Sequence, residues 1–167
     1  DILVNNAGIT RDGFFHKMSH DQWSDVIRVN MDSVFNTTRQ VINGMRERGY
    51  GRIVNISSIN GQKGQFGQVN YSAAKAGDIG FTKALAQEGA AKGITVNTLP
   101  PFAFDTPMLR EQQRDDKLPP AEYLVKAIPA GRLGTGEDIA ALCGFLCSEA
   151  AGYITGQVVC IDGGMSL

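Results

Sequence analysis

Two side chains, Tyr71 and Lys75, have the types and the spacing of an acid–base pair. They lie four positions apart in "VNYSAAKAGDIG", a helical run, so both would occupy one helical face. A free tyrosine has a pKa of about 10, and a neighbouring ammonium lowers it by favouring the phenolate. Tyr71 could then give a proton to a carbonyl oxygen or take one from an alcohol. The same two residues could also form an ordinary surface hydrogen-bonding pair.

One further polar residue, Ser58, could serve the same carbonyl group. Ser58 ends the strand-like run "GRIVNISS", 13 residues before Tyr71. Its hydroxyl could donate to a carbonyl oxygen as charge builds there, or it could simply cap the following loop. Asn30 lies inside a predicted helix, where Asn is mildly unfavourable. It is either exposed, or its side chain and the local backbone hold a water.

The order of the predicted elements indicates a scaffold that could gather these residues. Strands are predicted at residues 2–4, 51–58, 94–99 and 156–164, and helices at residues 19–49, 70–91 and 136–151. This alternation predicts an α/β fold with a doubly wound parallel sheet and helices on both faces. Ligands of such sheets bind beyond the carboxyl ends of the strands. The strand-end turns "NNAG", "SS" and "PPF" would therefore line one edge.

Two segments between these elements are expected to be irregular. Residues 59–68, "INGQKGQFGQ", form a glycine-rich run that predicts a loop. Residues 100–130 are rich in proline and carry the charged run "REQQRDDK", which favours a long excursion with one or two short helices. We expect this excursion on the substrate side of the domain.

Composition excludes several classes of function. The 167 residues suffice for one domain, and a net charge of −1 gives no electrostatic case for nucleic acid or a membrane surface. No run is long and apolar enough to span a membrane. Cys143 and Cys147 stand one helical turn apart in an apolar run, which favours core residues over metal ligands. No metal site is predicted, and the cysteines fit a reducing cytoplasmic compartment.

The motifs together resemble those of the short-chain dehydrogenase/reductase family. They are "NNAG", "VN", "NISS", the Tyr-x-x-x-Lys pair with a Ser 13 residues upstream, "VN" closing a strand, and the terminal "DGG". Within the family, "NNAGITRD", "GRIVNISSINGQKGQFGQVNYSAAKAG" and "FTKALAQE" are similar to acetoacetyl-CoA reductases of polyhydroxybutyrate synthesis. The 3-oxoacyl-[acyl-carrier-protein] reductases and a non-catalytic cofactor-binding relative stay open as alternatives.

The resemblance implies a Rossmann-like enzyme that reduces a 3-oxoacyl thioester, acetoacetyl-CoA to 3-hydroxybutyryl-CoA, with NADP(H) as cofactor and NAD(H) left open. It implies that Tyr71 delivers the proton and that Lys75 lowers the pKa of Tyr71 and holds the nicotinamide ribose. Ser58 would hold the keto oxygen, and Asn30 would position a water in the proton relay. A homotetramer is the usual assembly in this family.

The resemblance also implies two sets of binding residues. Besides Tyr71 and Lys75, the cofactor contacts are expected from Asn6, Ala7, Gly8, Ile9, Pro101 and Phe102. The substrate contacts are expected from Asp12, Gln65, Phe66 and Gln68. The family usually has Ser-Pro-Gly where this chain has Pro100, Pro101 and Phe102, so a glycine is replaced by a bulky ring near the nicotinamide.

The family's glycine-rich phosphate loop, G-x-x-x-G-x-G, is absent from the sequence. The chain also starts at Asp1 and enters an apolar strand at once. We therefore expect residues 1–167 to be the C-terminal two thirds of a single Rossmann-type domain that lacks its N-terminal nucleotide-binding half. Such a fragment alone would bind NADPH poorly and be inactive.

Overall fold

A parallel three-stranded sheet forms the centre of the computed structural model, which describes residues 1–115 and 119–167. Its strands are β1 (Ile2–Asn5), β2 (Gly51–Ile56) and β3 (Ile94–Leu99), in the order β1-β2-β3. In register, Val54 pairs with Val4 on one side and with Asn97 on the other. The carboxyl ends of all three strands therefore meet at one edge, as predicted.

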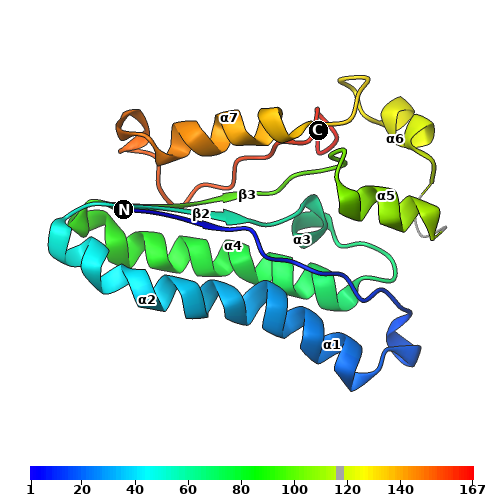
Figure 1. The fold of residues 1–167 in the computed structure, drawn as a ribbon, viewed down its shortest axis with the longest axis horizontal. Helices are drawn as coiled ribbons and strands as arrows, with labels where there is room; N and C mark the ends of the chain where they lie inside the picture. The colour runs from blue at the N-terminus through cyan, green and yellow to red at the C-terminus, as the bar shows by residue number, and fades with distance from the viewer. Residues whose placement is uncertain (116–118) are drawn as a thin grey trace.

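Helices cover both faces of the sheet, which confirms the predicted α/β arrangement (Figure 1). One face carries α1 (His20–Ile27), the π-helical turn η2 (Arg28–Asp32), α2 (Ser33–Arg48) and α4 (Val69–Gly89). The other face carries α7 (Gly136–Cys147). The shorter elements are η1 (Phe15–Lys17), α3 (Ile59–Lys63), η3 (Ala90–Lys92), α5 (Pro107–Arg114), α6 (Ala121–Ala127) and η4 (Glu149–Ala151).

The central strand β2 joins the two cores because its successive side chains point to opposite faces. Ile53 packs with residues of α2, α4 and β3: Met45, Ala86, Ile94 and Val96. Val54 packs on the other side with Leu99, Leu146 and Ala151. A strand buried on both faces is typical of a parallel sheet covered by helices.

The helix predicted over residues 19–49 is interrupted. Ser19 caps α1 through a capping box with Gln22, and Gly49, at φ 69°, ends α2, so both ends lie where the sequence indicates. Between α1 and α2 the chain forms the π-helical turn η2, which holds Asn30 fully buried. Single π-helical turns within α-helices are frequent at functional sites.

The loop predicted over residues 59–68 contains a helix, α3. The Ser58 hydroxyl accepts from the Asn60 amide at 3.1 Å and caps this helix, and Gly64, at φ 73°, follows its end. α3 packs so closely on α4 that a Cβ on Gly61 would lie 2.6 Å from the Lys75 carbonyl carbon. Because Gly61 has no side chain, α3 can pack directly against the backbone of Lys75.

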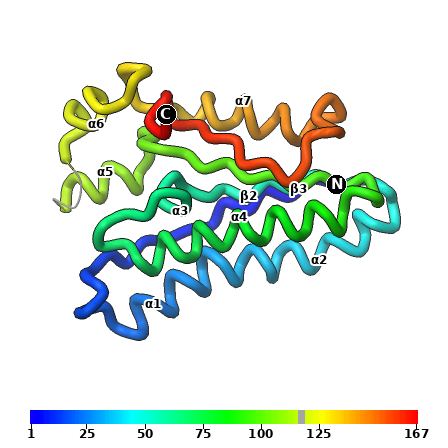
Figure 2. Tube along the Cα trace, turned by 180° about the vertical axis from the view of Figure 1, so that it is seen from behind, coloured from blue at the N-terminus to red at the C-terminus, as the bar shows by residue number. Residues whose placement is uncertain are grey.

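The strand predicted over residues 156–164 forms only in part. This segment runs beside β3 (Figure 2) and exchanges backbone hydrogen bonds with it around the bridges Thr98–Val158 and Pro101–Ile161, but these bridges stay isolated and form no continuous strand. Side chains replace part of the ladder, because the Asn97 amide donates to the Ile154 carbonyl and its oxygen accepts from the Gln157 amide. A continuous set of backbone bonds is therefore interrupted.

The proline-rich excursion contains the two short helices that the sequence predicts. α5 and α6 lie at the end of the molecule away from the N-terminus, in both views (Figures 1 and 2). The Gln112 amide of α5 donates to the Thr10 hydroxyl at 3.3 Å, which ties α5 to the loop after β1. Residues 116–118 of the charged run lie outside the described residues.

A buried polar network crosses the sheet just before its carboxyl edge. Asn5 donates to the Asn55 side-chain oxygen at 2.8 Å, and Asn55 donates to the Thr82 hydroxyl at 2.9 Å. The Thr82 and Thr98 hydroxyls share a further hydrogen bond. The network links β1, β2, α4 and β3, and so fixes the strand ends that carry the site.

We expect Asn55→Leu to lower the free energy of unfolding by about 2–4 kcal/mol, because each buried polar partner left unsatisfied costs about 1–3 kcal/mol. Denaturant unfolding of the whole protein measures this change. Asn36→Leu, on the exposed side of α2, serves as the control and should stay within about 0.5 kcal/mol of wild type. Equal effects of the two substitutions would contradict a stabilising network at Asn55.

Candidate active site

α4 carries the predicted acid–base pair toward the carboxyl end of β2. The Lys75 ammonium donates to the Ile56 carbonyl at 2.6 Å and to the Asp78 carboxylate at 3.2 Å. Lys75 is only 4% exposed and Tyr71 is half-buried. The pair therefore is not an ordinary surface contact, and it lies at the sheet edge where ligands of α/β folds bind.

Asp78 is part of this cluster, although no pattern in the sequence distinguishes it. It lies one helical turn beyond Lys75, is 1% exposed and forms a buried ion pair with the ammonium. Its Oδ1 atom has no hydrogen-bond partner in the part of the chain that the structure describes. Burial raises the pKa of Asp78 to about 6, although the charge of Lys75 and its hydrogen bond act to lower it.

The pKa of Tyr71 is shifted upward, whereas the sequence predicts a downward shift. Burial raises the pKa of the phenol above its ordinary value, a hydrogen bond with the Ser58 hydroxyl lowers it, and the Asp78 and Asp12 carboxylates raise it. Lys75 does not produce the predicted net lowering, because its charge is paired with Asp78. Tyr71 is thus held in its protonated form at neutral pH.

Ser58 fills one of the two roles that the sequence left open, that of a cap. Its oxygen accepts from the Asn60 amide at the start of α3, and its hydroxyl acts to lower the pKa of Tyr71. A serine hydroxyl has one proton and two lone pairs, so both contacts are compatible. The cap orients the hydroxyl toward the phenol.

Asn30 is not exposed, which excludes one of its two predicted alternatives. Its Oδ1 accepts from the Ile9 amide at 2.7 Å, and its Nδ2 donates to the Ile9 carbonyl at 2.9 Å. A Cβ on Gly8 would lie 3.4 Å from Oδ1 of Asn30 and 3.9 Å from Nζ of Lys75. Asn30 therefore holds the loop after β1 close to Lys75.

We expect the Ile9 amide to exchange its proton about ten times faster in Asn30→Ala, since one lost hydrogen bond is worth about 1 kcal/mol or more. Hydrogen exchange followed by NMR measures this rate. In Asn30→Asp the acceptor of the Ile9 amide is kept, so the protection should be retained. Unchanged exchange in Asn30→Ala would show that the loop is held by other contacts.

The structure brings together two of the four residues predicted to contact substrate, Asp12 and Gln68. Gln68 donates to the Asp12 carboxylate at 3.0 Å, and the Phe66 ring packs edge-on against Phe14 at 5.3 Å between centroids. Oδ1 of Asp12 is buried without a partner. The Gln65 side chain is exposed. The loop after β1 and the segment before α4 thus form one wall.

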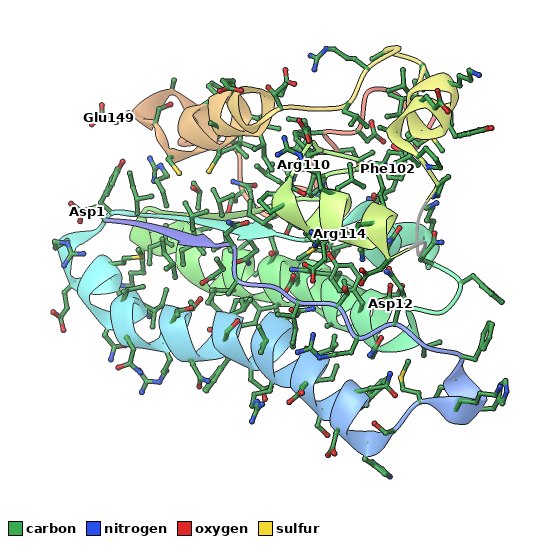
Figure 3. The ribbon with its side chains drawn as sticks, turned by 45° about the vertical axis from the view of Figure 1, so that its right-hand side comes forward. Asp1, Asp12, Phe102, Arg110, Arg114 and Glu149 are labelled. Carbon is green, nitrogen blue, oxygen red and sulfur yellow. The ribbon has the colours of Figure 1, made fainter. Side chains whose placement is uncertain are left out.

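The predicted cofactor residues occupy two loops at the same edge. Asn6 and Ala7 are exposed on the loop after β1. On the loop after β3, the Pro101 carbonyl accepts from the Ile59 amide at 3.2 Å, directly beside Ser58. Figure 3 shows Asp12 and Phe102 at this end of the molecule, with α5 between them in this view.

The departure from the family pattern at Phe102 changes the local backbone. Phe102 is half-buried, and its ring lies 5.8 Å from the Lys63 ammonium. The next residue, Ala103, has φ 42°, a left-handed conformation that a glycine adopts at lower cost. Phe102 also lines a hollow of about 180 Å³ with Phe104 and Ile161, and neither Tyr71 nor Ser58 lines that hollow.

The chemistry available here is proton transfer beside an ammonium. A carbonyl oxygen placed against Tyr71 and Ser58 would receive hydrogen bonds from both hydroxyls. Among the residues that the structure describes, no group of three or more His, Cys, Asp or Glu side chains is arranged to hold a metal ion. Within residues 1–115 and 119–167, no helix has the length and apolarity needed to cross a membrane.

Comparisons with known proteins match nearly the whole chain. A family described as enoyl-(acyl carrier protein) reductase matches residues 1–166. The chain is 59% identical to the acetoacetyl-CoA reductase of Rhizobium meliloti over 98% of the chain and 67% of that relative. It is 53% identical to the acetoacetyl-CoA reductase of Cupriavidus necator over 100% of the chain and 66% of that relative.

A further relative is named for a different substrate. The 3-oxoacyl-[acyl-carrier-protein] reductase of Vibrio cholerae is 46% identical over 99% of the chain and 66% of its own length. The chain thus spans about two thirds of the length of the curated relatives that it matches.

Proposed function

The chain belongs to the short-chain dehydrogenase/reductase family, and from that premise we propose that it carries the proton-transfer site of an acetoacetyl-CoA reductase. The reaction is the NAD(P)H-dependent reduction of acetoacetyl-CoA to 3-hydroxybutyryl-CoA. The observation that carries the proposal is the buried Lys75 ammonium, held at the Ile56 carbonyl one helical turn from Tyr71 and at the strand end that leads to Ser58. Relatives named acetoacetyl-CoA reductase, 53–59% identical, support the substrate.

The edge beside Gly8 has the chemistry to hold a nicotinamide nucleotide. The Lys75 ammonium has three N–H groups, of which the Ile56 carbonyl and Asp78 take two, so one is left for a ribose hydroxyl. We assign cofactor binding to Tyr71, Lys75, the loop of Asn6, Ala7, Gly8 and Ile9, and the loop of Pro101 and Phe102. The bound cofactor, NADP(H) in this proposal, supplies a hydride to the 3-keto carbon.

The protein supplies the proton. Tyr71 donates its phenolic proton to the keto oxygen as hydride transfer makes that oxygen basic. Ser58 hydrogen-bonds to the same oxygen, and this stabilises the charge that develops on it. Because the pKa of Tyr71 is raised, the phenol is protonated before each reduction. Asn30 keeps the cofactor loop in place through Ile9 and, in this proposal, also positions a relay water.

The acyl thioester lies against the wall formed by Asp12, Gln65, Phe66 and Gln68 in this proposal. The Phe66 side chain is 83% exposed, which leaves its ring free to pack against an extended ligand.

The assembly and location follow the family. We propose a cytoplasmic homotetramer, for which Phe35 on α2, 56% exposed, and Val69 at the start of α4, 43% exposed, offer apolar contact area. The free thiols of Cys143, Cys147 and Cys160 fit a reducing compartment.

Steady-state assays on the whole protein test the substrate. We expect NADPH oxidation with acetoacetyl-CoA at a kcat/KM about tenfold or more above that with the carrier-protein thioester, a difference of about 1.4 kcal/mol. A preference for the carrier-bound substrate would instead assign the reaction of the Vibrio cholerae relative. Absence of turnover with both substrates in a folded protein that binds NADPH would contradict the proposal.

A further inference from the structure

Asp78 is a buried carboxylate beside the site to which the proposed reaction assigns no role. Its Oδ2 lies 3.2 Å from the Lys75 ammonium, and its side chain is 1% exposed. Its Oδ1 has no hydrogen-bond partner among residues 1–115 and 119–167, although an unsatisfied buried charged group is costly to fold. A buried polar group without a partner calls for a functional reason.

The geometry places Asp78 behind Lys75 as seen from Tyr71. Positions 71, 75 and 78 follow one another along a single side of α4. The Ile56 carbonyl and Asp78 together take two of the three ammonium protons, so they determine where the third one points. A lysine side chain without the Asp78 contact would have one anchor instead of two.

We infer that Asp78 is a positioning residue for the reduction, because its carboxylate anchors the Lys75 ammonium and so determines where the remaining ammonium proton points. The inference rests on the proposed function and adds a residue to it. Asp78 touches neither the keto group nor the nicotinamide in this account. It acts through its contact with Lys75 and through the electrostatic effect of its charge on Tyr71.

The charges around this pair determine the sign of the effect. Lys75 is the charged group that acts on Asp78, and the Asp78 and Asp12 carboxylates are the charged groups that act on Tyr71. Asn30 on η2 and Ser58 at the end of β2, which also border the cluster, are uncharged. Removing the Asp78 charge therefore favours the Tyr71 phenolate, both directly and by leaving the Lys75 charge unopposed.

Asp78→Asn tests this with a side chain of nearly the same shape. The rate of reduction needs a protonated Tyr71, so it falls at alkaline pH as the phenol ionises. We expect this alkaline limb to move to lower pH by about one unit in Asp78→Asn. Glu88→Gln removes the same charge from an exposed position of α4, and its profile should coincide with that of wild type.

A second readout separates this inference from the proposed function. Tyrosinate absorbance, taken as the difference between each protein and its Tyr71→Phe counterpart, reports the ionisation of Tyr71 without any turnover. A lower midpoint in Asp78→Asn supports the inference even if acetoacetyl-CoA is not the substrate. An unchanged or higher midpoint overturns the inference even if the enzyme reduces acetoacetyl-CoA.

Wild-type protein provides the same test if Asp78→Asn does not fold. The carboxyl carbon of Asp78, followed by NMR, should titrate at about pH 6. The Nζ resonance of Lys75 should shift over the same range, because the two groups are in contact. A Lys75 resonance that does not respond to this titration would overturn the anchoring role.

Discussion

Tyr71→Phe is expected to lower kcat for reduction by about 100- to 10,000-fold, the usual contribution of a positioned general acid. The substitution removes the phenolic hydroxyl, and with it the proton that is transferred to the keto oxygen. It keeps the ring, so the packing of α4 against α3 and the anchoring of Lys75 should persist. KM for the thioester should change little, because substrate binding is assigned to the wall formed by the loop after β1 and the segment before α4.

Initial rates of NADPH oxidation by wild type and variant measure this difference. Tyr153→Phe is the matched control, because that side chain is fully exposed, and it should keep wild-type kcat. Equal rates for Tyr71→Phe and wild type would remove the catalytic assignment. Wild type that binds NADPH without reducing any 3-oxoacyl thioester would instead identify a non-catalytic cofactor-binding relative.

Lys75→Met is expected to affect both activity and stability. Removing one partner of a buried ion pair costs about 3–5 kcal/mol, since the Asp78 carboxylate is left uncompensated. Activity should fall by about 100-fold or more, because the ribose anchor and the local positive charge are both lost. Denaturant unfolding and initial rates give the two quantities on the same protein.

The pH dependence of this stability loss has a defined sign. In wild type the pKa of Asp78 is raised to about 6. Without Lys75 it rises further, so at low pH the variant carries a neutral Asp78 and loses less. Above about pH 6 the wild-type carboxyl is ionised, whereas the folded variant must keep a proton on its unpaired buried carboxyl, so the deficit relative to wild type should grow as pH rises.

A double variant separates the two effects. Lys75→Met combined with Asp78→Leu replaces the ion pair by apolar groups, which is often neutral or stabilising. We expect it to regain most of the stability and none of the activity. Lys83→Met, at an exposed position of α4, is the control. Recovery of activity in the double variant would contradict the role of Lys75.

The sequence indicated the acid and its neighbours through spacing. Tyr71 and Lys75 share a helical face, and Ser58 ends a strand, so local periodicity was enough to place them at one edge. Asn30 could be selected only through the family resemblance, because a polar residue in a helical run carries no signal of its partner. Its partner is the Ile9 backbone, 21 residues earlier.

The remaining parts of the site depend on contacts between distant segments. Asn55 looks like one polar residue in an apolar strand, and only the register of β1 and β2 brings it to Asn5. In the sequence, Asp78 resembles an ordinary polar position of α4, and only the structure shows that it is buried and paired with Lys75. The segment after α7 has a strand-like pattern, but the Asn97 side chain takes backbone groups that a ladder would use.

The central claim is that Tyr71 protonates a 3-keto group as it receives a hydride. The most direct measurement supplies NADPH deuterated at its transferable position and analyses the product of acetoacetyl-CoA by mass spectrometry. The account predicts 3-hydroxybutyryl-CoA with the label on its hydroxyl-bearing carbon from wild type, and at most about one hundredth of that amount from Tyr71→Phe in the same time. Equal labelled product from both proteins, or none from folded, NADPH-bound wild type, would contradict it.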